Sequence, residues 1–210
     1  SVTNRSTSAD ARFKALVRLL ASDSADRISP AGLEGNDLHL ARKQLGVDLP
    51  PFLRTLLVAD GTVTMALEAF YDEPVDVVTM NQASEALETS LPALVIEQGE
   101  EVLYREVILR GRQSDCVYAS AYSLIRKAAV GQSLYQALVE ERVGIGTLLR
   151  NTAKGSYREI LKLRVGGLGD DLEIGAGELM VNRTYCVYLD SAPGILITEV
   201  FPVSRYMSGR

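Results

Sequence analysis

From residue 75 onward, apolar and polar residues alternate in short runs, the pattern of β-strands whose successive side chains point to opposite faces. Loops of a few residues join most of these runs, as between Arg110 and Cys116. Strands connected in this way pair antiparallel, so we expect an α+β fold in which helices gather on one side of an antiparallel sheet. The predicted strands are Val75–Met80, Val102–Arg110, Cys116–Leu124, Tyr157–Val165, Arg183–Leu189 and Ile195–Phe201.

Apolar residues at helical spacing predict the remaining elements. The first helix is expected at Ala11–Ala21, with Asp10 as its N-cap. A second helix begins at Pro50-Pro51, because proline suits a first helical turn, and it stops at Asp60-Gly61. Further helices are predicted at residues 62–71, 134–139 and 147–152, the first of them with Thr62 or Thr64 as its N-cap.

The chain divides near residue 48 into two parts. Residues 1–48 hold the first helix, three glycines and a short helical piece at about residues 38–45, which together predict a helical extension that wraps around a domain. Residues 49–210 hold all of the predicted strands and form that domain. A glycine-rich segment at residues 166–169 lacks the lysine and hydroxyl residue of a phosphate-binding loop, so we interpret it as a connection.

The charge balance limits the classes of partner. Lysine and arginine total 22 against 27 aspartate and glutamate residues, a net charge of −5, and the chain has no basic tract. This composition argues against a nucleic-acid-binding protein. No apolar run approaches the roughly 18–20 residues that span a bilayer, and no signal segment opens the chain, so we expect a cytoplasmic protein without a membrane span. No feature of the sequence predicts an oligomeric state.

The few thiol and imidazole groups restrict the chemistry. Cys116 and Cys186 lie in apolar, strand-like runs, and we interpret both as reduced core residues. The single histidine, His39, stands in a polar connecting region and is interpreted as a surface residue. One histidine and two separate cysteines match no familiar zinc site and argue against a Ser-His-Asp or Cys-His mechanism. We therefore expect no metal site.

Two charged residues stand where the alternation of the strands calls for apolar ones. Arg105 falls in line with the apolar positions of residues 102–110, and Glu199 with those of residues 195–201. A charge on a buried apolar face needs a partner, because leaving it unpaired is prohibitive. The two residues either form a buried ion pair with each other or bind a ligand in a pocket built around them, and the pattern leaves both possibilities open.

The corner between the second and third predicted helices is a further candidate for ligand binding. A helix that starts directly after Asp60-Gly61 leaves its first backbone N–H groups without helical partners. Such groups bind carboxylates well, although most helix starts bind only water or a capping side chain.

Five segments of the chain carry a family resemblance through their order and spacing. They are LLVADGTVTMALEA, REVILRG, VYASAYSLI, GIGTLL and ITEVFP, within about residues 50–203. Together they resemble the chorismate pyruvate-lyases, most closely the branch found in cyanobacteria, actinobacteria and archaea. The resemblance implies a six-stranded antiparallel sheet of the chorismate lyase-like, or UTRA-like, fold, with flap-like helical segments over a ligand. It also implies an enzyme that converts chorismate to 4-hydroxybenzoate and pyruvate without metal or cofactor, for use in quinone biosynthesis.

The resemblance implies roles for individual residues as well. Arg105, in the REV segment, would hold the aromatic carboxylate. Glu199, in the ITEVFP segment, would contact the ring hydroxyl, either as an orienting acceptor or as a proton carrier. Backbone amides of two flaps would complete the carboxylate site, in segments that contain Thr62, Val63, Ile145 and Gly146.

The chain departs from the family pattern at one position. Where the enterobacterial enzyme has a second arginine on the next strand, this chain has Ala121. Chorismate carries two carboxylates, so its enolpyruvyl carboxylate then needs another partner. Arg183 is the first candidate for that role, and Arg158 and Lys162 are others.

Two other functions stay open. The effector domains of GntR-type regulators share this fold and bind ligands without catalysis. They follow a basic winged-helix module, for which the residues before Pro50 are too few and too poor in lysine and arginine. The second alternative is a lyase that releases a different hydroxybenzoate, because the position of the ring hydroxyl depends on Å-scale geometry that motifs do not carry.

Overall fold

The computed structural model describes residues 7–22, 42–43, 46, 48–140, 144–150, 155–175 and 177–207. The expected surface position of His39 lies outside these residues, and so does most of the helical piece expected at residues 38–45. Among the helices in the described ranges, none is both long and apolar enough to cross a membrane.

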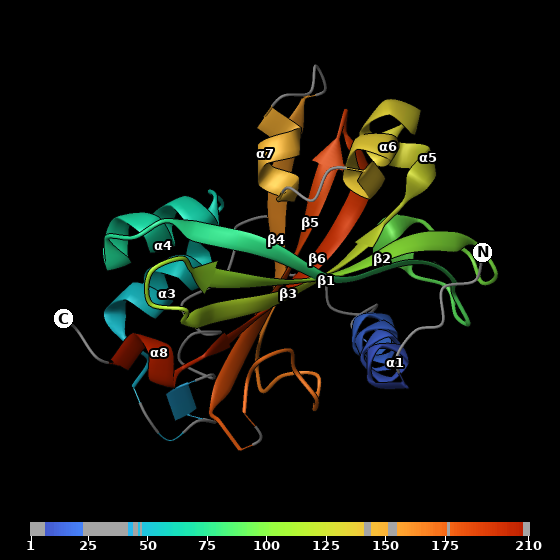
Figure 1. Ribbon diagram of the computed structural model, residues 1–210. Coiled ribbons are helices and arrows are strands. Elements are labelled where there is room, and N and C mark those ends of the chain that lie inside the picture. Colours follow the sequence, from blue (N-terminus) through green and yellow to red (C-terminus); the bar gives the residue numbers. More distant parts are fainter. Residues whose placement is uncertain are drawn as a thin grey trace.

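One antiparallel sheet of six strands organises the molecule, in the spatial order β1-β2-β3-β6-β5-β4 (Figure 1). All the predicted strands are present, which confirms the α+β fold. The first strand continues past Met80 to Ala86, because an edge strand stays partly exposed and tolerates polar residues that do not read as a strand. The strands are β1 Val75–Ala86, β2 Glu101–Gly111, β3 Val117–Ile125, β4 Ser156–Val165, β5 Met180–Leu189 and β6 Ala192–Pro202.

The predicted helices that fall on described residues are present with shifted ends, and the structure adds short helices that the sequence did not predict. The first helix starts at Thr7, so the prediction of Asp10 as N-cap is wrong; buried Ala9 extends the apolar stripe by part of a turn. Thr62 is the N-cap residue of the third predicted helix, but its side chain makes no capping hydrogen bond. The helices are α1 Thr7–Ser22, α3 Pro51–Val58, α4 Val63–Tyr71, α5 Lys127–Val130, α6 Gln132–Glu140, α7 Ile145–Arg150 and α8 Ser204–Met207, with a 3-10 turn, η1, at Pro92–Leu94.

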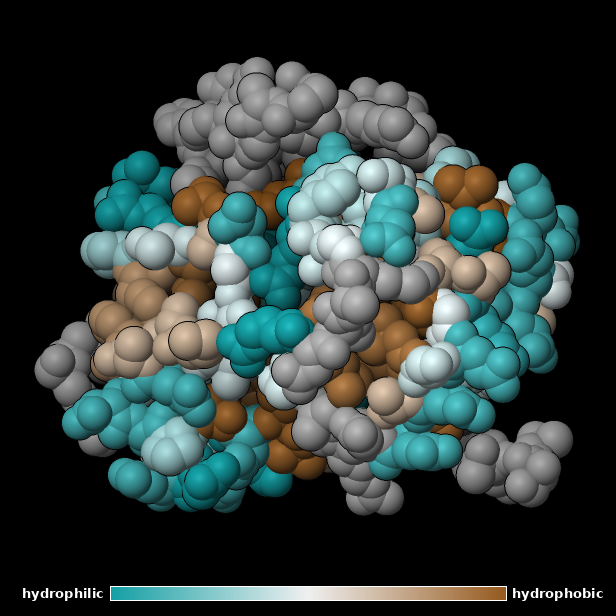
Figure 2. Space-filling model, turned by 90° about the horizontal axis from the view of Figure 1, so that it is seen from above, coloured by the Kyte–Doolittle hydropathy of each residue, from teal (hydrophilic) through white to brown (hydrophobic). Residues whose placement is uncertain are grey.

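Helices cover both faces of the sheet. On the face that carries Arg105 and Glu199, which we call the Arg105 face, two hydrophobic clusters join the sheet to α3 and α4 and to α5, α6 and α7. The predicted gathering of helices on one side holds for these five. The opposite face, the α1 face, is covered by α1, whose Phe13 ring lies 5.1 Å from that of Tyr104 (Figure 1). Seen from above, the side that carries α5, α6 and α7 presents hydrophilic residues with hydrophobic ones visible between them (Figure 2).

A buried ion pair fastens α1 to the sheet. The guanidinium of Arg12 donates to both carboxylate oxygens of Glu106 on β2, at 2.7 and 3.0 Å, and the hydroxyl of Tyr104 donates to the same carboxylate at 2.6 Å. Glu106 is fully buried. Because Glu106 directly follows Arg105, this pair also fixes the strand that carries the first candidate site residue.

Both cysteines are free thiols. Cys186 is fully buried in the cluster beneath α1, as predicted for a core residue, whereas Cys116 is half-buried just before β3. Burial raises the pKa of the Cys116 thiol, so the thiol form of Cys116 prevails.

Candidate active site

The Arg105 face contains a small cavity beneath the first turns of α4 and α7, which we call the inner cavity. It encloses about 80 Å³, several times the space that one water molecule requires. Side chains of β2, β3, β5 and β6 form its floor. Its polar and charged lining residues are Thr62, Thr64, Arg105, Ser123, Arg158, Tyr185 and Glu199.

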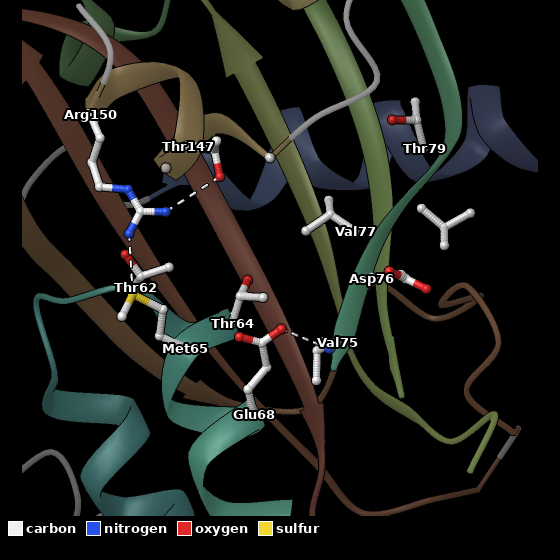
Figure 3. Close-up of a pocket in the computed structure, with 13 residues that line it drawn as sticks. Thr62, Thr64, Met65, Glu68, Val75, Asp76, Val77, Thr79, Thr147 and Arg150 are labelled. Carbon is white, nitrogen blue, oxygen red and sulfur yellow. Dashed lines mark hydrogen bonds between the residues drawn. The ribbon is translucent and has the colours of Figure 1, made fainter. Parts of the chain in front are cut away.

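A larger cavity, the outer cavity, adjoins the inner one between α4, α7 and the beginning of β1 (Figure 3). It encloses about 610 Å³. Arg150 reaches across it from α7, with Nη1 3.2 Å from the sulfur of Met65 and Nη2 3.5 Å from the hydroxyl of Thr147. The two cavities share the lining residues Thr62, Thr64, Val77, Gly144 and Gly146.

Arg105 lies on the floor of the inner cavity with 1% of its surface exposed. Its Nη2 donates to the hydroxyl of Thr79 on β1 at 3.0 Å. Burial lowers the pKa of Arg105 from its ordinary value, because an ion in a low-dielectric site loses solvation. The strand pattern alone therefore located a buried arginine that faces a cavity.

Glu199 lies on the same floor, two strands away on β6. Its Oε2 accepts a hydrogen bond of 2.7 Å from Nε of Arg183, and its Oε1 accepts one of 3.1 Å from the hydroxyl of Tyr185. Burial, followed by the charge of Glu199, raises the pKa of Tyr185, so this phenol remains a donor. One possibility that the sequence left open was a buried ion pair between Glu199 and Arg105. The structure instead pairs Glu199 with Arg183.

Arg183 connects Glu199 to the end of α3. Its Nη1 donates to three backbone carbonyls at the C-terminal end of that helix, those of Leu56 at 2.7 Å, Leu57 at 3.3 Å and Ala59 at 2.7 Å. Only 2% of Arg183 is exposed, and it is not among the described residues that line the inner cavity. This geometry gives Arg183 the position of a support for Glu199, whereas the sequence suggested it as a partner for a second substrate carboxylate.

The two predicted flap segments both line the inner cavity. Thr62 and Val63 line it from the start of α4, and Ile145 and Gly146 line it from the start of α7. The first amides of an α-helix have no partner within the helix. Amides from two different segments therefore stand at the roof of a cavity whose floor holds a buried arginine.

The other two candidate cations on β4 lie on opposite faces of the sheet. Arg158 lines the inner cavity, and its Nη1 donates to the backbone carbonyl of Asp60 at 2.9 Å. Lys162 is in register with Thr184, which belongs to the α1 face, because a bulge between Ile160 and Lys162 shifts the alternation of β4. Lys162 is therefore turned away from the cavity.

Sequence reasoning missed four polar residues of the site: Thr64, Thr79, Ser123 and Tyr185. Tyr185 follows Arg183 by two positions on β5, so period-two alternation could have placed both on one face. Thr79 and Ser123 carry no such signal, because hydroxyl residues are ordinary in strands.

Solved structures share this architecture. PhnF from Mycobacterium smegmatis matches with a TM-score of 0.56 at 14% identity, over 94% of this chain and 96% of that chain. The effector domain of PhnF from the same organism matches with a TM-score of 0.52 at 16% identity, over 70% of this chain and 91% of that chain. At these identities the likeness bears on the fold alone, and it confirms the predicted UTRA-like fold.

Sequence relatives are enzymes by name. The chorismate pyruvate-lyase of Mycobacterium leprae is 26% identical over 153 residues, which cover 71% of this chain and 73% of that protein. The chorismate pyruvate-lyase of Mycobacterium tuberculosis strain H37Rv is 27% identical over 157 residues, covering 71% and 78%. The family model "Chorismate pyruvate-lyase Rv2949c-like" matches residues 57–207, well over half of the chain. The chain belongs to the Rv2949c-like family of chorismate pyruvate-lyases.

Proposed function

We propose that this protein is a chorismate pyruvate-lyase that converts chorismate to 4-hydroxybenzoate and pyruvate. The observation that carries the proposal is one cavity, in a chain of this family, whose floor holds both Arg105 and Glu199. The family resemblance supports two further parts of the proposal, a cytoplasmic location and the use of the product as a quinone precursor.

Arg105 is the proposed anchor for the ring carboxylate. A guanidinium offers a planar set of donors that meets a carboxylate through two parallel hydrogen bonds, the strongest simple arrangement for such an anion. The backbone amides of Val63 and Ile145 are proposed to complete the carboxylate site from the roof of the cavity, with Thr62 and Gly146 beside them.

Glu199 is the proposed partner of the ring hydroxyl. A carboxylate has about four lone-pair sites. Arg183 and Tyr185 each donate to one of its oxygens, which fixes the group in place and leaves acceptor capacity toward the cavity. In the reaction, the carboxylate of Glu199 either accepts a proton from the ring or only orients the ring through its hydroxyl.

The reaction makes the ring aromatic, which supplies a large driving force. A ring C–H proton leaves and its electron pair joins the ring, while the C–O bond to the enolpyruvyl group breaks and its electron pair goes to the departing oxygen. The enolpyruvate then takes a proton on its methylene carbon and becomes pyruvate. The proposed contribution of the protein is to hold a reactive conformer, stabilise charge on the departing group and assist the proton transfer.

The test is to incubate the purified chain with chorismate in the presence of a chelator and to identify the products by mass and retention. We expect pyruvate and 4-hydroxybenzoate in equal amounts. Release of a different hydroxybenzoate would favour the alternative lyase. Activity that disappears with the chelator and returns with a divalent ion would refute the metal-free mechanism.

A non-catalytic binding domain of the same fold is the alternative from another class. Such a protein would bind 4-hydroxybenzoate in a calorimetric titration and release no pyruvate from chorismate. The solved structures named above do not decide between the two functions, because at 14% and 16% identity they bear on the fold alone.

A further inference from the structure

Arg158 lies where the two roof segments of the inner cavity meet. Its Nη1 donates to the carbonyl of Asp60, in the corner that precedes α4, at 2.9 Å. A Cβ atom added to Gly146, in the first turn of α7, would stand 3.3 Å from its Nη2. The guanidinium thus touches the α4 segment with one nitrogen and directs the other toward the start of α7, where a larger residue than Gly146 would crowd it.

The charge of Arg158 is not balanced by a carboxylate within the described residues. Its described contacts are the Asp60 carbonyl and the ring of Tyr185, whose centroid lies 5.8 Å from the guanidinium carbon. The ion pairs among the described residues involve other cations, such as Arg12 and Arg183. Arg158 is half-buried and lines the cavity, so an anion that enters there would meet a cation with donors to spare.

Arg158 and Arg105 approach the cavity from different sides. Arg105 stands on β2 and Arg158 on β4, with β3, β6 and β5 between them. Strand spacing separates the backbones of β2 and β4 by roughly 19 Å. The two guanidinium groups lie considerably closer together than this, because both arginine side chains point inward. Glu199 stands on β6, halfway across. The order of the three groups across the sheet is therefore cation, carboxylate, cation.

We propose that Arg158 holds the second carboxylate of a dicarboxylate substrate. It would thus replace the second arginine of the enterobacterial enzyme, which stands where this chain has Ala121. This inference rests on the proposed function. In chorismate the ring carboxylate and the ring hydroxyl lie at opposite ends of the ring, and the enolpyruvyl group is attached beside the hydroxyl. With the ring carboxylate at Arg105 and the hydroxyl at Glu199, the enolpyruvyl carboxylate extends toward Arg158.

This role makes a kinetic prediction. The enolpyruvyl carboxylate is charged both in the substrate and in the transition state, so Arg158 contributes binding that is equal in the two. Arg158→Ala should therefore raise KM for chorismate by roughly 10- to 100-fold, the range for a hydrogen bond to a charged group, with little change in kcat. Arg158→Lys should recover part of the loss, because an ammonium keeps the charge but not the planar fork.

Product binding separates this role from a structural one. 4-Hydroxybenzoate has no second carboxylate, so its Kd should differ between Arg158→Ala and wild type by no more than about twofold. The matched control is Lys162→Ala, which removes a cation from the same strand on the opposite face and should change neither KM nor Kd.

The outcomes distinguish this inference from the proposed function. If wild type turns over chorismate and Arg158→Ala keeps its KM, the role of Arg158 is refuted while the proposed function stands. An equal loss of chorismate and 4-hydroxybenzoate binding would also refute it, since it would mean that Arg158 only shapes the cavity. If wild type neither binds nor converts chorismate, the proposed function fails first.

Discussion

Replacing Glu199 by glutamine tests what the negative charge of this side chain contributes to stability and to catalysis. The change keeps the shape of the side chain and one acceptor oxygen. It removes the negative charge that pairs with Arg183 and the capacity to accept a proton. Both partners are buried, Arg183 with 2% and Glu199 with 5% of its surface exposed, so solvent screens the interaction little.

The expected loss in the free energy of unfolding is about 1.5–3 kcal/mol, the range for hydrogen bonds to charged groups. Removing one partner of a buried ion pair outright costs about 3–5 kcal/mol. The lower range applies because Arg183 keeps its three carbonyl acceptors on α3 and its charge stays hydrogen-bonded. For a chain of this length the melting temperature should therefore fall by roughly 3–12 °C.

Catalysis and product binding should separate in the same variant. If Glu199 moves a proton in the transition state, kcat should fall by roughly 10²–10⁴-fold. Affinity for 4-hydroxybenzoate should change far less, because the amide oxygen can still accept a hydrogen bond from the ring hydroxyl. Pyruvate release, calorimetric titration and scanning calorimetry measure the three quantities. Tyr185→Phe is the matched control, since it removes the 3.1 Å hydrogen bond and leaves the ion pair in place.

A double-mutant cycle with Arg183→Met decides whether the pair is energetically coupled. We expect a coupling energy of about 1 kcal/mol or more between Glu199 and Arg183. If Glu199→Gln melts at the wild-type temperature and the cycle gives no coupling, the reasoning from buried geometry is wrong. An unchanged kcat in Glu199→Gln would show that Glu199 does not transfer a proton in the reaction.

Substitutions at three further residues test other parts of the structure. Arg105→Ala should weaken binding of 4-hydroxybenzoate by roughly 2–5 kcal/mol in a titration, and Arg105→Lys should recover only part; wild-type affinity in both would contradict the site. Arg12→Met should lower the free energy of unfolding in urea by about 3–5 kcal/mol, because it leaves Glu106 buried without its cation; a loss below about 1 kcal/mol would contradict this. Hydrogen bonds from Ser114 and Tyr118 lower the pKa of Glu73 from 4.5 to about 2, so its contribution is complete above pH 4.5 and disappears as the pH falls toward 2. Glu73→Gln should abolish the loss in melting temperature that Glu73 causes between pH 4.5 and about 2. An unchanged pH dependence of the melting temperature would contradict this role of Glu73.

The strands and the two unusually placed charges could be predicted from the sequence, because both depend on local patterns. Alternation with a period of two is visible within one strand, and it places Arg105 and Glu199 on buried faces without knowledge of any partner. The ends of elements were less predictable. An edge strand such as β1 continues through polar residues, and α1 begins among serines and threonines that usually cap or precede a helix.

Partners across long sequence distances could not be predicted. Arg12 and Glu106 are 94 positions apart, and nothing local to either residue names the other. The assignment of Lys162 failed for a different reason. A simple alternation puts Arg158 and Lys162 on one face, but the bulge after Ile160 sends them to opposite faces, and a bulge leaves no mark in a pattern of apolar and polar residues.

Two arginines from neighbouring strands donate to backbone carbonyls between the end of α3 and the start of α4. Arg183 on β5 binds the carbonyls at the end of α3, and Arg158 on β4 binds the next carbonyl along, that of Asp60. Both guanidiniums also lie over the ring of Tyr185, at 5.2 and 5.8 Å. Positive groups at a helix C-terminus offset the partial negative charge of its last carbonyls.

The support of the sheet residue Glu199 and the position of the roof amides of α4 are thus parts of one arrangement. A substitution at Arg183 should disturb the floor and the roof together, whereas Arg158 can exchange solvent for a substrate carboxylate while it keeps its contact with the corner. Substitutions at Arg183 and in the Asp60–Thr62 corner should therefore be non-additive in their effects on product affinity.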